Sequence, residues 1–83
     1  MKKTIYEDDY AHLTRRLVAM RAEAGLTQRK LAQMLRWPQS VVARIETAER
    51  RMDVLEFMMW CEVLKADPGK TLAEVHKEVL KHR

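Results

Sequence analysis

Apolar residues recur at every third or fourth position through most of the chain, separated by polar and charged residues. Leu13, Leu17 and Met20 show this spacing first, and Gly25 follows them as a residue that commonly closes a helix. The same period continues in four later segments: 27–36, 38–46, 53–66 and 67–83. The pattern predicts an all-α chain of five helices.

Capping residues and turn formers mark where the predicted helices begin. The acidic residues Glu7, Asp8 and Asp9 favour the positive end of a helix dipole, so the first helix is expected to begin there, with residues 1–7 as a flexible arm. Proline disfavours helical geometry in the residue before it, so the second helix should end at the corner before Pro38. The remaining start signals are Thr27, the Asp53–Glu56 capping box and the Thr71–Glu74 pair.

The third predicted helix separates apolar from polar positions. Val42 and Ile45 are three residues apart and therefore point to the same, inward side. Four residues remain on the opposite side: Gln39, Ser40, Ala43 and Arg44. Two short helices joined by a tight corner, with a polar outer face on the second, are the arrangement by which a helix-turn-helix reads DNA.

The fourth predicted helix is apolar on two sides, which is typical of a helix that is buried twice or contacts a partner. Four of its residues are predicted to form a dimer or partner surface: Leu55, Met59, Trp60 and Val63. The C-terminal helix within residues 67–83 is a second candidate for dimerisation, since Leu72, Val75 and Val79 share one face.

Positive charge is concentrated on the central segment. Nine Lys or Arg stand against three Glu between Arg15 and Arg51, whereas the whole chain carries a net charge of +4. An excess of basic residues around the predicted motif is the footprint expected for phosphate binding. The alternative is that these side chains are only solvated helix faces.

Several classes of protein are disfavoured by what the sequence lacks. Cys61 is the single cysteine and cannot form an internal disulfide, which favours a reducing cytoplasm, and the longest apolar run, 57–61, is too short to cross a membrane. No nucleophile–base pattern or phosphate loop is visible, so no enzymatic activity and no cofactor are expected. His12, His76 and His82 have no companions at metal-ligand spacing, so no metal site is expected either.

Short motifs in order along residues 17–68 resemble one known family. They are Gly25-Leu26-Thr27-Gln28, Leu31-Ala32, Pro38-Gln39-Ser40-x-Val42, Arg44-Ile45-Glu46, and Glu49-Arg50-Arg51 leading to Asp53-Val54. The family is that of the Cro/C1-type, or XRE-like, helix-turn-helix DNA-binding domains. The resemblance implies one compact lambda-repressor-like domain over residues 1–83, with the motif at the second and third helices.

The resemblance also implies roles for particular residues. Base contacts are assigned to Gln39, Ser40, Ala43 and Arg44, and phosphate contacts to Gln28, Arg21, Trp37, Arg50 and Arg51. Arg21 and Glu46 correspond to a structural ion pair between the first and third helices. The chemistry agrees, because Gln pairs bidentately with adenine and Arg with guanine. The alternatives are that Gln39 and Ser40 only cap their helix and that Trp37 covers the core.

Three positions depart from the family pattern. Relatives usually have Gly where this chain has Arg36, Ala48 and Lys65, each near a turn that needs a left-handed backbone. A residue with a β-carbon costs about 1 kcal/mol there, so these turns are expected to be rebuilt locally.

The predicted function is that of a small transcriptional regulator that represses by occupying a promoter. One recognition helix reads few bases, so a homodimer on a palindromic operator is expected, with half-sites about 34 Å apart. One alternative is the antitoxin of a toxin–antitoxin pair, which binds its toxin through the fourth or fifth helix. Another is a protein-interaction module that no longer binds DNA.

Overall fold

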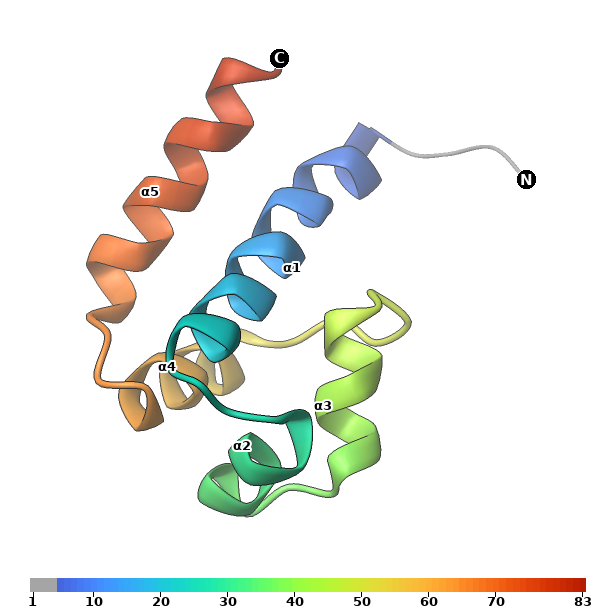
Figure 1. Ribbon diagram of the computed structural model, residues 1–83. Helices are drawn as coiled ribbons and strands as arrows, with labels where there is room; N and C mark the ends of the chain where they lie inside the picture. The colour runs from blue at the N-terminus through green and yellow to red at the C-terminus, as the bar shows by residue number, and fades with distance from the viewer. Residues whose placement is uncertain (1–4) are drawn as a thin grey trace.

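A computed structural model describes the backbone of residues 5–83 and the side chains from residue 8 onward. It contains five α-helices and, over that range, no strand: α1 (Ile5–Glu23), α2 (Gln28–Leu35), α3 (Gln39–Glu46), α4 (Val54–Val63) and α5 (Pro68–Lys81). Figure 1 shows α1 and α5 side by side in the upper half, with α2, α3 and α4 below them. The predicted all-α, five-helix fold is confirmed.

The first helix begins earlier than its acidic residues suggested. α1 starts at Ile5, so residues 5–7 belong to the helix and not to an arm, and the remainder of the predicted arm, 1–4, lies outside the described residues. An acidic residue favours the whole first turn of a helix and not a single position, so the charge pattern could not fix the first residue.

The core lies where α1, α2, α3 and α4 meet. Its buried residues are Leu17, Leu31, Ala32, Leu35, Val42, Ile45, Phe57, Trp60 and Cys61. Val42 and Ile45 are completely inaccessible, as their spacing predicted. Burial also raises the pKa of the Cys61 thiol, which keeps it protonated as a small apolar residue. None of the helices within residues 5–83 is long and apolar enough to cross a membrane.

Two of the predicted caps are present and one is wrong. Thr27 accepts the Lys30 N–H, and Asp53 forms its capping box with Glu56 at the start of α4. The fifth helix, however, begins at Pro68 with Asp67 as its N-cap, and Thr71 is buried inside it. Proline suits the first helical position because its missing N–H would have no partner there, so the Asp-Pro pair decides the start.

The three turns that lack the expected glycine keep the left-handed backbone. Arg36, Ala48 and Lys65 have φ angles of 62°, 65° and 60°, so the predicted local rebuilding is wrong. Each turn is closed by hydrogen bonds across it. The Trp37 N–H, for example, donates to the Ala32 carbonyl at 3.0 Å, and the Ala66 N–H donates to the Cys61 carbonyl at 2.9 Å. These bonds hold a conformation that costs about 1–2 kcal/mol for a residue with a β-carbon.

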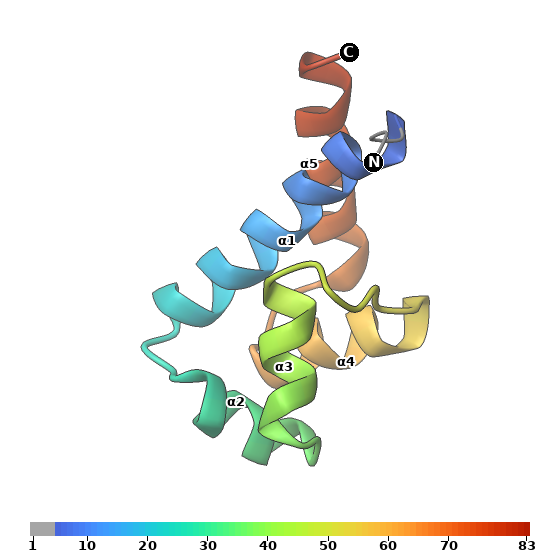
Figure 2. The ribbon, with the colours of Figure 1, turned by 90° about the vertical axis from the view of Figure 1, so that its right-hand side faces the viewer.

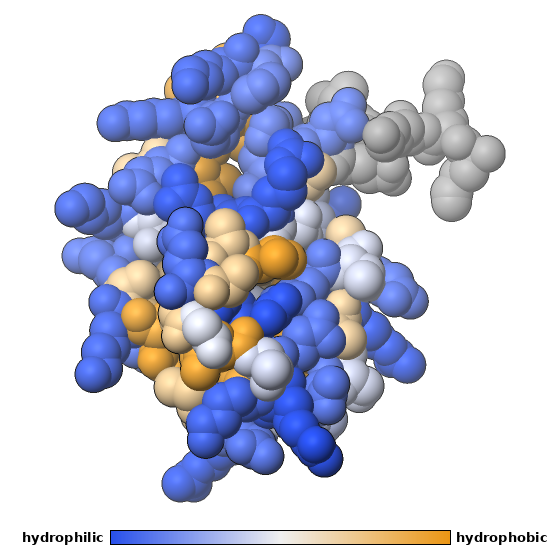
Figure 3. Space-filling model, viewed as in Figure 1, coloured by the Kyte–Doolittle hydropathy of each residue, from blue (hydrophilic) through white to orange (hydrophobic). Residues whose placement is uncertain are grey.

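The apolar surface of α4 is made of partly different residues from those that the sequence indicated. Trp60 is completely buried in the core, so its assignment to a partner surface is wrong, and Val63 is half-buried against the same core. Leu55 and Met59 are exposed, at 68% and 39%, and so are Val54 and Met58, which the sequence did not assign to this surface. A helix that is apolar on two sides gives no periodic signal for which side faces inward, so only packing could choose. Figure 3 shows apolar residues gathered near the middle of one face of the molecule and surrounded by hydrophilic ones.

Candidate nucleic-acid interface

The second and third helices form a compact corner. α2 ends at Leu35, residues 36–38 make the turn, and α3 begins at Gln39. Ala32 is 3% exposed, and its small side chain allows the two helices to pack closely at the corner. In Figure 2, α3 faces the viewer with no other element in front of it. The corner therefore presents one side of α3 to solvent.

The solvent side of α3 carries the polar residues that the sequence assigned to DNA. Gln39, Ser40 and Arg44 are exposed, and Ala43 is half-buried beside them. The N-cap of α3 is Pro38, and no side chain donates or accepts a capping hydrogen bond there, so Gln39 and Ser40 do not serve as caps. No ion pair among the described side chains involves Arg44. All three side chains are thus available to a ligand on one face.

The corner is also positively charged. Residues 26–45 contain four basic residues and no Asp or Glu: Arg29, Lys30, Arg36 and Arg44. All four are exposed. The next acidic residue, Glu46, has a side chain that is only 4% exposed and paired with arginine. Exposed positive charge around a helix N-terminus favours the approach of anions such as phosphates.

A hydrogen-bonded network ties the two helices of the corner to α1. The Glu46 carboxylate accepts from Arg21 Nε at 2.6 Å and Nη2 at 3.0 Å, and from Gln28 Nε2 at 2.8 Å. Arg21 Nη1 also donates to the Leu26 carbonyl at 2.8 Å, and its side chain is 17% exposed. Hydrogen bonding to Glu46 raises the pKa of Arg21. The network fixes the start of α2 relative to the end of α3.

The loop after α3 is held from both sides. Arg50 forms two hydrogen bonds to Glu56, from Nη1 at 3.1 Å and from Nη2 at 2.7 Å, which raise the pKa of Arg50 and lower the pKa of Glu56. Arg51 lies over the ring of Tyr10, 4.4 Å from its centroid, and the Tyr10 hydroxyl accepts the Met52 N–H at 3.1 Å. Arg50, predicted to contact phosphate, is therefore already engaged by a carboxylate within the chain.

Sequence reasoning missed Tyr10 and placed Trp37 only in part. Tyr10 lies 42 residues from Met52 along the chain, and no local pattern connects them. Trp37 is half-buried against the core, with its ring centroid 6.4 Å from that of Trp60, so core packing accounts for most of its surface. Trp37 lies in the turn between α2 and α3 and packs over the buried core residues there.

Two of the histidines, which have no companions at metal-ligand spacing in the sequence, lie near other ligand-type side chains in the fold. His12 on α1 meets Glu78 and His82 on α5, with one ligand atom of each lying within 4.8 Å of the others. Residues 12 and 78 are far apart in sequence, so their spacing could not reveal the group.

The comparisons with known proteins agree with this geometry. Residues 12–75 match a family model described as a helix-turn-helix domain. Among solved structures, an XRE-family like protein from Pseudomonas syringae pv. tomato str. DC3000 is 40% identical, with a TM-score of 0.84 over 89% of this chain and 90% of that one. No curated protein matches the chain closely enough to count as a relative.

Proposed function

We propose that this chain, which belongs to the XRE-type helix-turn-helix domain family, binds a specific double-stranded DNA site and represses transcription there. The family consists of DNA-binding regulators and is typically non-enzymatic. The observation that carries the proposal is the face of α3. Gln39, Ser40 and Arg44 project there together from a helix held in place by buried Val42 and Ile45, and their side chains have no partner among the residues that the structure describes.

Recognition divides between base edges and phosphates. The base contacts belong to Gln39, Ser40, Ala43 and Arg44, since a major groove admits one helix and these residues share its outer face. Phosphate contacts belong to Arg51 beyond α3 and to the start of α2, where Gln28 stands at a helix N-terminus and would exchange its hydrogen bond to Glu46 for one to a phosphate. Arg21 and Trp37 support these contacts from positions that are mostly covered, and Arg50 stiffens the loop through Glu56.

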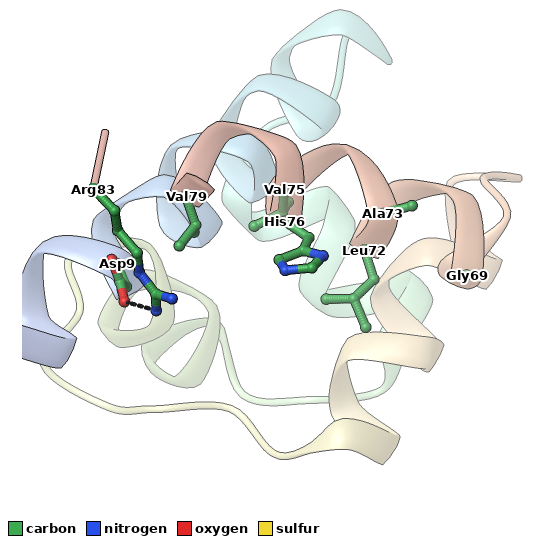
Figure 4. Close-up of a pocket in the computed structure, with 8 residues that line it drawn as sticks. All are labelled: Asp9, Gly69, Leu72, Ala73, Val75, His76, Val79 and Arg83. Atoms are coloured by element: carbon green, nitrogen blue, oxygen red, sulfur yellow. Dashed lines mark hydrogen bonds and ion pairs between the residues drawn. The ribbon is translucent and has the colours of Figure 1, made fainter. Parts of the chain in front are cut away.

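The functional unit in this proposal is a homodimer on a palindromic site. Leu55 and Met59 on α4 and Leu72 on α5, which is 53% exposed, supply apolar surface for a second copy. Figure 4 shows a groove along α5 lined by Leu72, Val75 and Val79 and closed at one end by the Arg83–Asp9 ion pair at 2.6 Å. In this proposal, repression means that the bound dimer covers the promoter.

Selection of bound sequences from random duplex DNA at two salt concentrations tests the proposal. A specific regulator will enrich one sequence, and a dimer will enrich a palindrome with half-sites about 34 Å apart. Arg44→Ala should relax selection at particular base pairs. Arg51→Ala should instead weaken binding to every sequence and lower the salt-dependence slope by about one unit. Lys77→Ala, an exposed basic residue on α5, is the matched control and should change neither.

Two other functions are outcomes of the same experiments. Failure to shift any DNA at low salt would refute the proposal and favour a protein-interaction module. If Arg44→Ala lost affinity for all DNA sequences by the same factor, Arg44 would not read bases. Co-purification of a toxin bound to the exposed residues of α4 or α5 would favour an antitoxin that regulates its own operon.

A further inference from the structure

The region where α1 and α5 run side by side holds a group of side chains that the DNA-binding proposal does not use. We propose that His12, Glu78 and His82 form a site for a late first-row divalent cation such as Zn²⁺, which clips α5 to α1. Imidazole nitrogens and a carboxylate oxygen form one of the ligand sets that zinc takes in proteins, with water completing the coordination.

Two of the three ligands come from α5 and the third comes from α1. Glu78 and His82 lie four residues apart, one turn along α5, and His12 approaches them from α1. One ligand atom of each lies within 4.8 Å of the others, and the two imidazole centroids are 4.7 Å apart. Because both helices contribute, the group exists only when α5 is packed against α1.

One of the histidines is already oriented for coordination. His82 Nδ1 lies 2.9 Å from the Glu78 backbone carbonyl, and a carbonyl can only accept, so Nδ1 carries the hydrogen. The neutral ring therefore keeps the lone pair on Nε2, the nitrogen that remains for a metal. A hydrogen bond from the other ring nitrogen to a carbonyl is the usual support of a metal-binding histidine.

Little movement is needed to close the site. Ligand atoms about 2.1 Å from a tetrahedral zinc are about 3.4 Å from one another. Separations of at most 4.8 Å must therefore shorten by about 1.4 Å or less. Glu78 and His82 lie in the last turn and at the C-cap of α5, so a small shift of that end of the helix toward α1 can supply most of this change without breaking the Nδ1 hydrogen bond of His82.

Neighbouring cations compete with the metal. Arg15 Nη2 lies 2.8 Å from His12 Nδ1, and since a guanidinium only donates, this bond occupies the lone pair of that nitrogen. Lys81 Nζ lies 3.9 Å from a Glu78 oxygen and competes for that carboxylate. Arg16 is instead paired with Glu74 at 2.9 Å. A metal must displace the Arg15 bond before His12 can bind it. The proposal therefore predicts that removing Arg15 strengthens metal binding.

Two titrations of the full chain test the site. Calorimetry measures the binding of ZnCl₂, and visible absorption measures the binding of CoCl₂. The wild type should bind one cation per chain, and the melting temperature should rise by roughly 10 °C or more when free metal is about 100-fold above its dissociation constant. His82→Ala and His12→Ala should each weaken binding at least about tenfold. Arg15→Ala should tighten it, and circular dichroism should show that every variant remains helical.

His76→Ala is the matched control, since His76 is an exposed histidine on α5 outside the group. It should bind Zn²⁺ as the wild type does. The proposal is overturned if the wild type does not bind saturably, if His82→Ala binds as tightly as the wild type, or if His76→Ala loses as much affinity as His82→Ala. Weaker binding by Arg15→Ala would overturn the assignment of that arginine as a competitor.

Discussion

Replacing Glu46 with alanine removes the acceptor that joins α1, α2 and α3. The carboxylate accepts three hydrogen bonds, two from Arg21 and one from Gln28. The change leaves the Arg21 guanidinium with a single carbonyl partner, that of Leu26, in a position where its side chain is only 17% exposed. We therefore expect Glu46→Ala to be among the most destabilising single changes on the motif.

The magnitude follows from the burial of the pair. Breaking a buried ion pair by removing one partner costs roughly 3–5 kcal/mol, because the other charge stays uncompensated. The remaining exposure of Arg21 allows some solvation, so the lower end applies and about 3 kcal/mol is expected. A domain of 83 residues has a total free energy of unfolding of about 4–12 kcal/mol. The melting temperature should fall by roughly 12–24 °C.

Urea unfolding followed by circular dichroism measures this loss, with Glu49→Ala as the control. Glu49 is exposed and accepts only from the Thr47 hydroxyl, at 2.9 Å, so its loss should cost less than about 0.5 kcal/mol. The double variant Arg21→Met with Glu46→Leu removes both charges and should be more stable than Glu46→Ala, since no buried charge is left unpaired.

The reasoning fails if Glu46→Ala and Glu49→Ala unfold at the same urea concentration. It also fails if the double variant is less stable than Glu46→Ala. Either result would mean that the buried charge of Arg21 finds a partner or solvent without Glu46.

Two further predictions concern the turns and the loop after α3. Lys65→Gly should stabilise the protein by about 0.5–1 kcal/mol because Lys65 has a φ of 60°, whereas Lys70→Gly, in an exposed helical turn, should destabilise it by a similar amount. Thermal unfolding compares the two variants, and a change in stability of the same sign in both would contradict backbone strain at Lys65. Hydrogen bonding to Arg50 lowers the pKa of Glu56 below its ordinary value of 4.5, so its contribution is complete above that pH and is lost as the pH falls through the lowered pKa. Urea midpoints between about pH 7 and about pH 3 should therefore fall less steeply in Glu56→Gln than in the wild type, and identical slopes would refute the pairing.

The sequence by itself determined the parts of this protein that depend on local periodicity and capping. The three-residue spacing of Val42 and Ile45 fixed which side of α3 is buried, and hence which polar residues face outward. Thr27 and Asp53 fixed two helix starts because a cap acts on backbone groups within the next turn. The family pattern also marked three left-handed turns, although it did not predict that residues other than glycine would keep them.

Only the tertiary structure decided the parts that depend on contacts between distant segments. It buried Trp60 and left Leu55 exposed, a choice that a helix apolar on two sides cannot make from its own sequence. It paired Arg50 with Glu56 through hydrogen bonds and placed His12 beside the last turn of α5. Periodicity constrains neighbours one turn apart, whereas these pairings depend on how whole helices pack, which is set by the summed burial of the core.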